Sequence, residues 1–213
     1  AKIAQLVGDD IRVPPALVDR IAARAEGNPF FLDELINYLH LQGIDFRDAD
    51  ALDRVALPDS VQRLVLSLVD RFSESQKITV KVASVIGRVF QAAWLWGVYP
   101  QIGDATRVRE DLETLRRQEL LLPAPGEPEL TYFFRQVITQ GVTYESLPFA
   151  VKSTLHEQIG DFLEASYAGA LDSVLDLLAF HYDRSENMTK RRLYLRRAGE
   201  AAQSLYANDA AID

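Results

Sequence analysis

Apolar residues near the start of the chain recur every three or four positions, which is the spacing of one face of a helix. This pattern covers residues 15–24 and again residues 29–41. Between them, Asn28 is suited to cap a helix, and Pro29 to occupy its first position, where no N–H is needed. We therefore predict two helices joined by a tight loop. A solvated acidic link would follow them.

A second run of helical spacing begins at Leu57-Pro58 and ends near Leu120. It predicts four helices, over residues 61–69, 74–86, 92–99 and 104–120. Three of these helices have a candidate capping residue at their N-terminus. These are Asp59 or Ser60, Ser73 with Gln76 at capping-box spacing, and Asp104.

The periodicity then changes from helical to extended. Residues 120–123 and 130–134 predict two short strands, and the Pro- and Gly-rich residues between them predict a turn. Helices followed by such a β-hairpin form the winged-helix pattern, with the turn as the wing. A further helix over residues 136–147 would complete the unit before Pro148.

Beyond Pro148 the pattern is helical throughout. Apolar stripes fall within residues 155–163, 174–180 and 194–205. Paired helices of this length indicate the beginning of a TPR-like helical array, whose units bury their faces against neighbours.

Composition limits the classes of function. The chain has 213 residues, 31 of them acidic and 23 basic, and its net charge of −8 disfavours nucleic acid and anionic lipid. It has no cysteine, which excludes disulfides and thiolate chemistry. No apolar run approaches the roughly 20 residues that span a bilayer, and no signal peptide is evident. We expect a cytoplasmic protein without membrane contact. Because the chain begins at Ala1 and stops within a predicted helix, we also expect it to be part of a longer protein.

Motifs for catalysis and metal binding are incomplete. The sequence has neither a P-loop nor a Gly-x-Ser-x-Gly elbow. His156-Glu157 begins like a zinc-protease helix, but Gly160 stands where the second histidine belongs. We expect His181-Tyr182 to be a packed, hydrogen-bonded pair, and Asp33-Glu34 to lie on a solvated face. The sequence predicts no catalytic residue and no metal ligand.

A winged helix raises the question of DNA binding. The predicted helix at 104–119 carries four arginines against five acids, and the wing adds Glu127 and Glu129. Since phosphate contacts need a cationic surface, we do not expect nucleic acid as a partner. A basic cluster on the last predicted helix would be a solvated face or would dock an acidic partner; its members are Lys190, Arg191, Arg192, Arg196 and Arg197.

Three strings together resemble a known family. They are RAEGNPFFLDEL at residues 24–35, LPDSVQ at 57–62, and FRQVI at 134–138 with YESL at 144–147. In this order they are similar to the region that follows the nucleotide-binding core in STAND-type signalling ATPases. The likeness is to the bacterial adenylate/guanylate cyclase-linked proteins and the large LuxR-type regulators, and it covers most of residues 15–210.

This resemblance implies a mainly α fold in three parts. A helical lid-type domain would occupy residues 1–56 and a winged-helix domain with a small β-hairpin residues 57–148. Residues 149–213 would begin the TPR-like array. In the family, the counterparts of Gly27 and Pro29 lie against the base or sugar of ADP or ATP, which a domain upstream of this chain would mainly hold. Many relatives carry histidine where this chain has Gln136, a substitution that leaves phosphate sensing there in doubt.

The implied function is regulatory and not enzymatic. The winged helix would act as an intramolecular clamp on the upstream ATPase domain and relay nucleotide state to an array that binds a protein partner or inducer. Two alternatives stay open: a DNA-binding winged-helix regulator, and a helical protein-interaction scaffold without nucleotide dependence.

Overall fold

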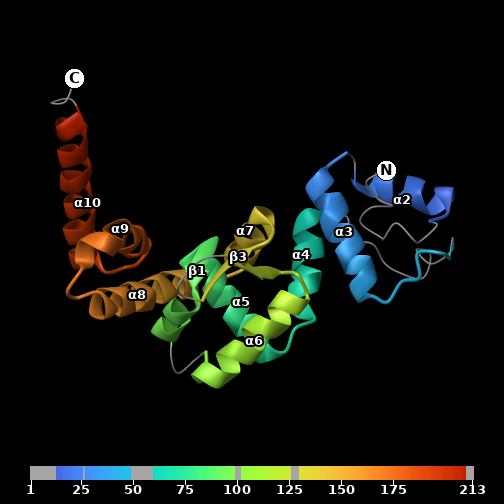
Figure 1. The fold of residues 1–213 in the computed structure, drawn as a ribbon, viewed down its shortest axis with the longest axis horizontal. Helices are drawn as coiled ribbons and strands as arrows, with labels where there is room; N and C mark the ends of the chain where they lie inside the picture. The colour runs from blue at the N-terminus through green and yellow to red at the C-terminus, as the bar shows by residue number, and fades with distance from the viewer. Residues whose placement is uncertain (1–12, 26, 49–59, 99–101, 126–129, 210–213) are drawn as a thin grey trace. The chain divides into compact units, whose positions relative to one another are not determined.

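The computed structural model shows a mainly helical chain with one small antiparallel sheet, as the sequence predicts (Figure 1). The chain forms two compact units, residues 1–72 and 73–213. The predicted limits at residues 56 and 148 stay predictions. The residues described are 13–25, 27–48, 60–98, 102–125 and 130–209.

The first unit is a small group of helices: α2 (Pro15–Ala25), α3 (Pro29–Leu41) and α4 (Val61–Asp70). Helix α4 begins at Ser60, whose side chain accepts a hydrogen bond from the Arg63 N–H at 3.3 Å. The apolar stripes of the three helices meet in one core, as their spacing predicts. Its most buried members are Leu17, Ile21, Leu35, Leu39, Leu64 and Leu68.

The second unit begins with α5 (Glu74–Ile86), which opens on the capping box that the sequence predicts. The Ser73 side chain accepts from the Gln76 N–H at 3.3 Å, and the Gln76 side chain accepts from the Ser73 N–H at 3.0 Å. Gly87, at φ +146°, ends the helix in a conformation that suits glycine.

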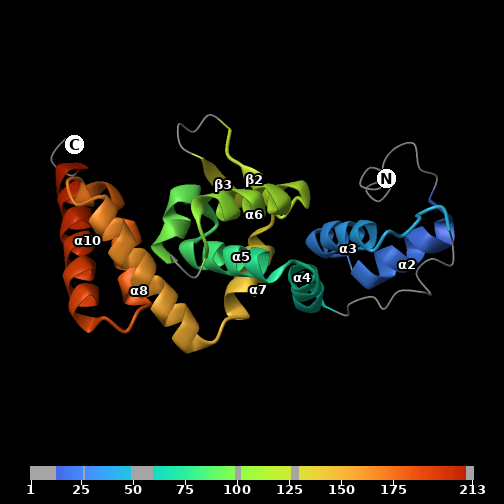
Figure 2. The ribbon, with the colours of Figure 1, turned by 90° about the horizontal axis from the view of Figure 1, so that it is seen from below.

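Three strands and two further helical segments follow along the chain, and the strands form one sheet (Figure 2). The elements in chain order are β1 (Val89–Gln91), the 3₁₀ helix η2 (Ala92–Val98), α6 (Ala105–Arg117), β2 (Leu121–Pro123) and β3 (Thr131–Phe134). The strand order is β1-β3-β2, and both pairs are antiparallel. Phe90 and Phe134, both fully buried, attach the sheet to the core.

Two sequence predictions are corrected here. The pattern predicts a two-stranded hairpin, but β1 adds a third strand because Val89–Gln91 pairs with β3, whose paired residues lie 40 to 44 positions further along the chain. Local periodicity does not reveal such a contact. Helix α6 ends at Arg117 and does not reach Leu120. Glu119 takes the left-handed φ of +57°, and the Leu120 N–H returns to the Leu115 carbonyl at 3.0 Å.

The rest of the second unit is helical. It consists of α7 (Val137–Glu145), α8 (Phe149–Ser166), the short η3 (Leu171–Val174), α9 (Leu175–Asp183) and α10 (Met188–Asp209). Helix α8 packs against η2, and α9 packs against both α8 and α10. Within the described ranges, no helix combines the length and apolar character needed to cross a membrane.

Candidate functional site

The predicted nucleotide-contacting residues lie in the loop that begins α3. The Asn28 side chain caps the helix by accepting from the backbone N–H of Phe30 at 3.0 Å and of Phe31 at 3.3 Å. Gly27 has φ +77°, and a Cβ added there would meet nothing within 4 Å. Gly27 and Pro29 are both exposed, and Phe30 is 55% exposed. The glycine is therefore needed for the backbone turn, and the loop presents a rigid, partly apolar surface to solvent.

The acidic pair on α3 differs from its prediction. Glu34 is only 6% exposed, although we expected both Asp33 and Glu34 on a solvated face. The reason is the helical spacing: Glu34 lies one turn from the buried Phe31 and Tyr38 and so shares their face of α3.

Gln136 stands at the position where the proposed resemblance would place a histidine. It is half-buried at the N-cap of α7, and its side chain makes no capping hydrogen bond to that helix. Gln136 belongs to the second unit, whereas Gly27 and Pro29 belong to the first. The three residues therefore do not form one site within either unit.

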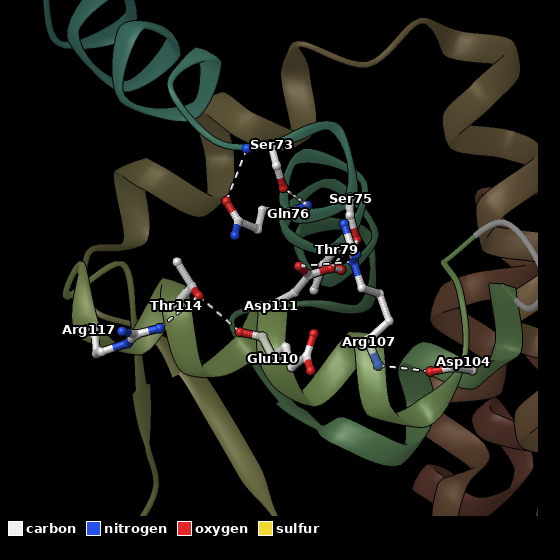
Figure 3. Close-up of polar contacts among 10 residues, drawn as sticks. All are labelled: Ser73, Ser75, Gln76, Thr79, Asp104, Arg107, Glu110, Asp111, Thr114 and Arg117. Carbon is white, nitrogen blue, oxygen red and sulfur yellow. Dashed lines mark hydrogen bonds and ion pairs between the residues drawn. The ribbon is translucent and has the colours of Figure 1, made fainter.

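Several polar residues on and next to α6 form hydrogen bonds with other residues of the protein (Figure 3). The Asp111 carboxylate is buried, and it accepts hydrogen bonds from Ser75 Oγ at 2.5 Å and Thr79 Oγ1 at 3.0 Å, both on α5. Arg107 Nε donates to Ser75 Oγ at 2.9 Å. The sequence analysis counted Asp111 among the five acids that offset the arginines of this helix, but Asp111 is buried and joins α6 to α5.

Two further arginines of α6 have partners on the same helix. Arg116 makes two hydrogen bonds to the Glu113 carboxylate, at 2.7 and 2.8 Å, and Arg117 donates to Thr114 Oγ1 at 3.2 Å. These contacts reduce the cationic character of the helix face that a DNA-binding winged helix would use. Glu127 and Glu129 of the predicted wing lie outside the described residues.

The basic cluster of α10 is largely neutralised by carboxylates of the same unit. Arg191 pairs with Asp183 at 2.8 Å and Arg197 with Asp172 at 2.9 Å. Arg196 lies 3.7 Å from Glu200, and Lys190 pairs with Glu164. Four of the five cations thus have partners within the chain, and three of these pairs connect α10 to η3, α8 or α9.

Two buried histidines form the most unusual polar contact in the described part of the second unit. His156 of α8 and His181 of α9 are fully buried, with their Nδ1 atoms 2.9 Å apart. The Tyr144 hydroxyl of α7 lies 3.1 Å from His156 Nε2. Since Nδ1 atoms that share a hydrogen bond must differ in protonation, one donates and the other accepts. His181 Nε2 is buried without a hydrogen-bond partner among the described residues, so we assign the His181 proton to Nδ1.

Burial controls the charge of this pair. Loss of hydration lowers the pKa of His156 to about 4, with the positive charges of Arg184 and Lys152 acting in the same direction. Burial likewise lowers the pKa of His181 to about 3, assisted by His156 and Arg184. Both rings are therefore neutral at pH 7. A weak signal for the pair is visible in the sequence, where each histidine falls on an apolar helix face.

Tyr182 is the other half of the predicted His181-Tyr182 pair, but each residue bonds elsewhere. The Tyr182 hydroxyl donates to Asp161 Oδ1 at 2.8 Å and lies 2.9 Å from Glu164 Oε2. Its ring stacks on Tyr194 of α10, with centroids 5.1 Å apart and planes 8° from parallel. Burial and the two carboxylates raise the pKa of Tyr182, which therefore stays a neutral donor.

Across the described ranges, no group of three or more histidines and carboxylates is arranged to hold a metal ion. Comparison of the sequence with protein-family models and curated proteins, and of the fold with solved structures, finds no significant match. Any assignment of function consequently rests on the residues and contacts described above.

Proposed function

We propose that this chain is a non-catalytic regulatory segment of a STAND-type signalling ATPase. It would relay the nucleotide state of an upstream domain through a winged-helix unit to a helical array that binds a protein partner or inducer. The proposal combines the sequence resemblance with three features of the structure, each of which supplies one part of such a relay.

The first feature is the order of elements from α5 to β3. The elements follow one another as helix, strand, helix, helix, strand and strand, and β1 pairs with the edge of β3 opposite to β2. This order matches the one expected of a winged helix. The third strand, which sequence reasoning missed, strengthens this interpretation. The packed α8–α9–α10 series similarly supports the start of a TPR-like array.

The observation that carries the proposal is the joint between η2 and α8. A Cβ added at Gly97 of η2 would lie 2.9 Å from Phe162 Cβ of α8, so only glycine allows this approach without displacement. Trp94 Nε1 donates to the Tyr167 hydroxyl at 3.3 Å, and that hydroxyl lies 3.3 Å from Gln91 Oε1. Such close packing makes the winged-helix unit and α8 move together, which a relay requires.

The nucleotide end of the relay is the loop at Gly27 and Pro29. Its exposure and its left-handed glycine suit close approach by a ligand or domain, and capping by Asn28 keeps Pro29 in a fixed position. ADP or ATP would be held mainly by the upstream domain.

The first test is the coding sequence upstream of this chain. A P-loop and an acidic Mg²⁺-binding strand there would support the proposal, and their absence would refute it. In the protein that includes both regions, titration with fluorescent ADP should show weaker binding for Pro29→Ala. Pro148→Ala, an exposed proline ahead of α8, is the matched control. Equal affinity of the two variants would contradict the role given to Pro29.

A second candidate is a protein-interaction scaffold without nucleotide dependence. It is favoured by apolar side chains left on the surface of α10, among them Leu193 and Leu195. This candidate predicts a partner complex whose affinity is the same with ADP, with ATP and without nucleotide. The DNA-binding alternative finds no comparable support, because three of the four arginines of α6, Arg107, Arg116 and Arg117, are bound within the chain.

A further inference from the structure

An apolar groove lies between α5, η2 and α8, with a volume of about 440 Å³. We refer to it as the α5–α8 groove. Its apolar lining includes Ile78, Val82, Val98, Leu147, Val151 and Leu155. A groove of this size is typical of sites for small organic ligands.

Part of this lining remains in contact with water. Ile78 is 38% exposed and Val151 is 42% exposed, although both are large apolar side chains at the groove. Covering these side chains would be favourable by the hydrophobic effect, which grows with the apolar area removed from water. The groove therefore has a driving force for binding an aliphatic group.

The groove also contains one cation, Lys81 of α5. The structure describes four lysines, and the other three each pair with a carboxylate: Lys77 with Glu74, Lys152 with Glu145, and Lys190 with Glu164. Lys81 is half-buried, and its ammonium group has no ion-pair partner within the described ranges. In a protein with 31 acidic residues, an unpaired lysine beside an apolar groove is a specific feature.

The other polar groups of the groove are neutral. They are Thr154 and Gln158, which lie one turn apart on α8. Thr154 Oγ1 already donates to the Ala150 carbonyl at 3.0 Å. The Gln158 amide adds a second potential donor to the groove, so its polar groups favour an acceptor group with negative charge.

We propose that the α5–α8 groove binds a medium-chain aliphatic monocarboxylate. The hydrocarbon chain lies along the apolar lining, and the carboxylate pairs with the Lys81 ammonium and accepts from Gln158. This site is independent of the nucleotide role proposed above. Because the ligand contacts α5 and η2 on one side and α8 on the other, it stabilises the joint between them.

Isothermal titration calorimetry with octanoate, below its micelle concentration, tests the proposal on the full chain. Octanoate should bind saturably with one ligand per chain. 1-Octanol, which has the same number of carbons and no charge, should bind more weakly because it cannot form the ion pair. Lys81→Gln should lower the affinity for octanoate at least about tenfold, since charged hydrogen bonds contribute more than neutral ones, and leave that for 1-octanol unchanged.

Two further variants control for folding and for general charge. Lys77→Gln removes a cation one turn away on α5 that does not line the groove, and it should bind octanoate as the wild type does. Ala150→Phe places a large ring in the groove from an exposed position of α8 and should abolish binding of both ligands. Circular dichroism establishes that each variant is folded.

The proposal is overturned if octanoate shows no saturable binding, if Lys77→Gln and Lys81→Gln weaken it equally, or if Ala150→Phe leaves it intact. Sedimentation equilibrium would then test whether a second copy of the chain covers the groove. A concentration-dependent dimer that Ala150→Phe disrupts would assign the groove to self-association in place of the monocarboxylate.

Discussion

Burial of His156 and His181 converts two ordinary histidines into a neutral, hydrogen-bonded pair. Their Nδ1 atoms are 2.9 Å apart, so protonating both rings would place two N–H groups and two positive charges against each other. Phe180 packs against both rings at centroid distances of 5.6 and 5.1 Å and excludes water. Protonation of both rings would therefore break the contact that joins α8 to α9.

A pH dependence of stability follows from this arrangement. The folded-state pKa values, about 4 and about 3, lie below the ordinary value of 6.5. Between these limits the unfolded chain binds more protons than the folded chain, so the free energy of unfolding rises with pH. The contribution is complete above about pH 7 and is lost as the pH falls toward 4. Urea unfolding of the wild type should lose at least about 2 kcal/mol more between pH 7 and pH 4.5 than the double variant His156→Gln/His181→Gln.

Carboxylates are also protonated in this pH range and change the stability of both proteins. The test is therefore the difference between the wild type and the double variant in how the free energy of unfolding depends on pH. His40→Gln alters an exposed histidine on α3 and should follow the wild-type profile. If the double variant and the wild type show parallel profiles, the histidine pair does not control acid stability.

At the scale of elements, the contact between η2 and α8 depends on a missing side chain. Gly97 allows the 3₁₀ helix to lie directly against Phe162 of α8, and Gly160 of α8 lies beneath the Tyr182 ring of α9, which is 3.0 Å from the position of an added Cβ. Both glycines therefore allow neighbouring helices to approach closely. Their role is the missing side chain, since neither has a positive φ.

Gly97→Ala should accordingly destabilise the chain, by about 1–3 kcal/mol, because the new methyl group must displace Phe162. Gly141→Ala is the matched control: its Cβ would meet nothing within 4 Å, and alanine is the better helix former. Thermal unfolding followed by circular dichroism should show a lower midpoint for Gly97→Ala and an equal or higher one for Gly141→Ala. Equal midpoints for both would contradict the close packing of the joint.

At the scale of the whole molecule, the chain consists of two units with separate cores. The apolar residues of α2, α3 and α4 pack among themselves, and the second unit has its own buried set around Phe90, Leu95, Leu112 and Phe134. Units with independent cores usually fold independently. The boundary between Phe72 and Ser73 directly precedes the capping box of α5.

Residues 73–213 should therefore fold without the preceding residues. We expect this piece to keep its helical circular dichroism and to unfold cooperatively on heating. Leu35→Ala in the first unit of the full chain should leave the unfolding midpoint of the second unit unchanged, because Leu35 belongs to the other core. A piece 73–213 without a cooperative transition would show that the second unit requires the first.

Local chemistry determined where four of the described helices begin. Asn28, Ser60, Ser73 and Asp104 each cap the helix that the sequence predicts at that position. The apolar faces of these helices were equally readable, because helical spacing and capping involve residues only a few positions apart. The resemblance to STAND-type ATPases adds an expectation about Gly27 and Pro29 that only experiments on a longer protein will test.

Tertiary structure alone decided the features that depend on distant residues. The strand β1 exists because it pairs with β3, Glu34 and Asp111 are buried by the packing of their helices, and His156 meets His181 across 25 positions. The α5–α8 groove likewise arises only where three elements meet. Periodicity describes one helix or strand at a time, whereas burial, pairing and cavities depend on which surfaces come together.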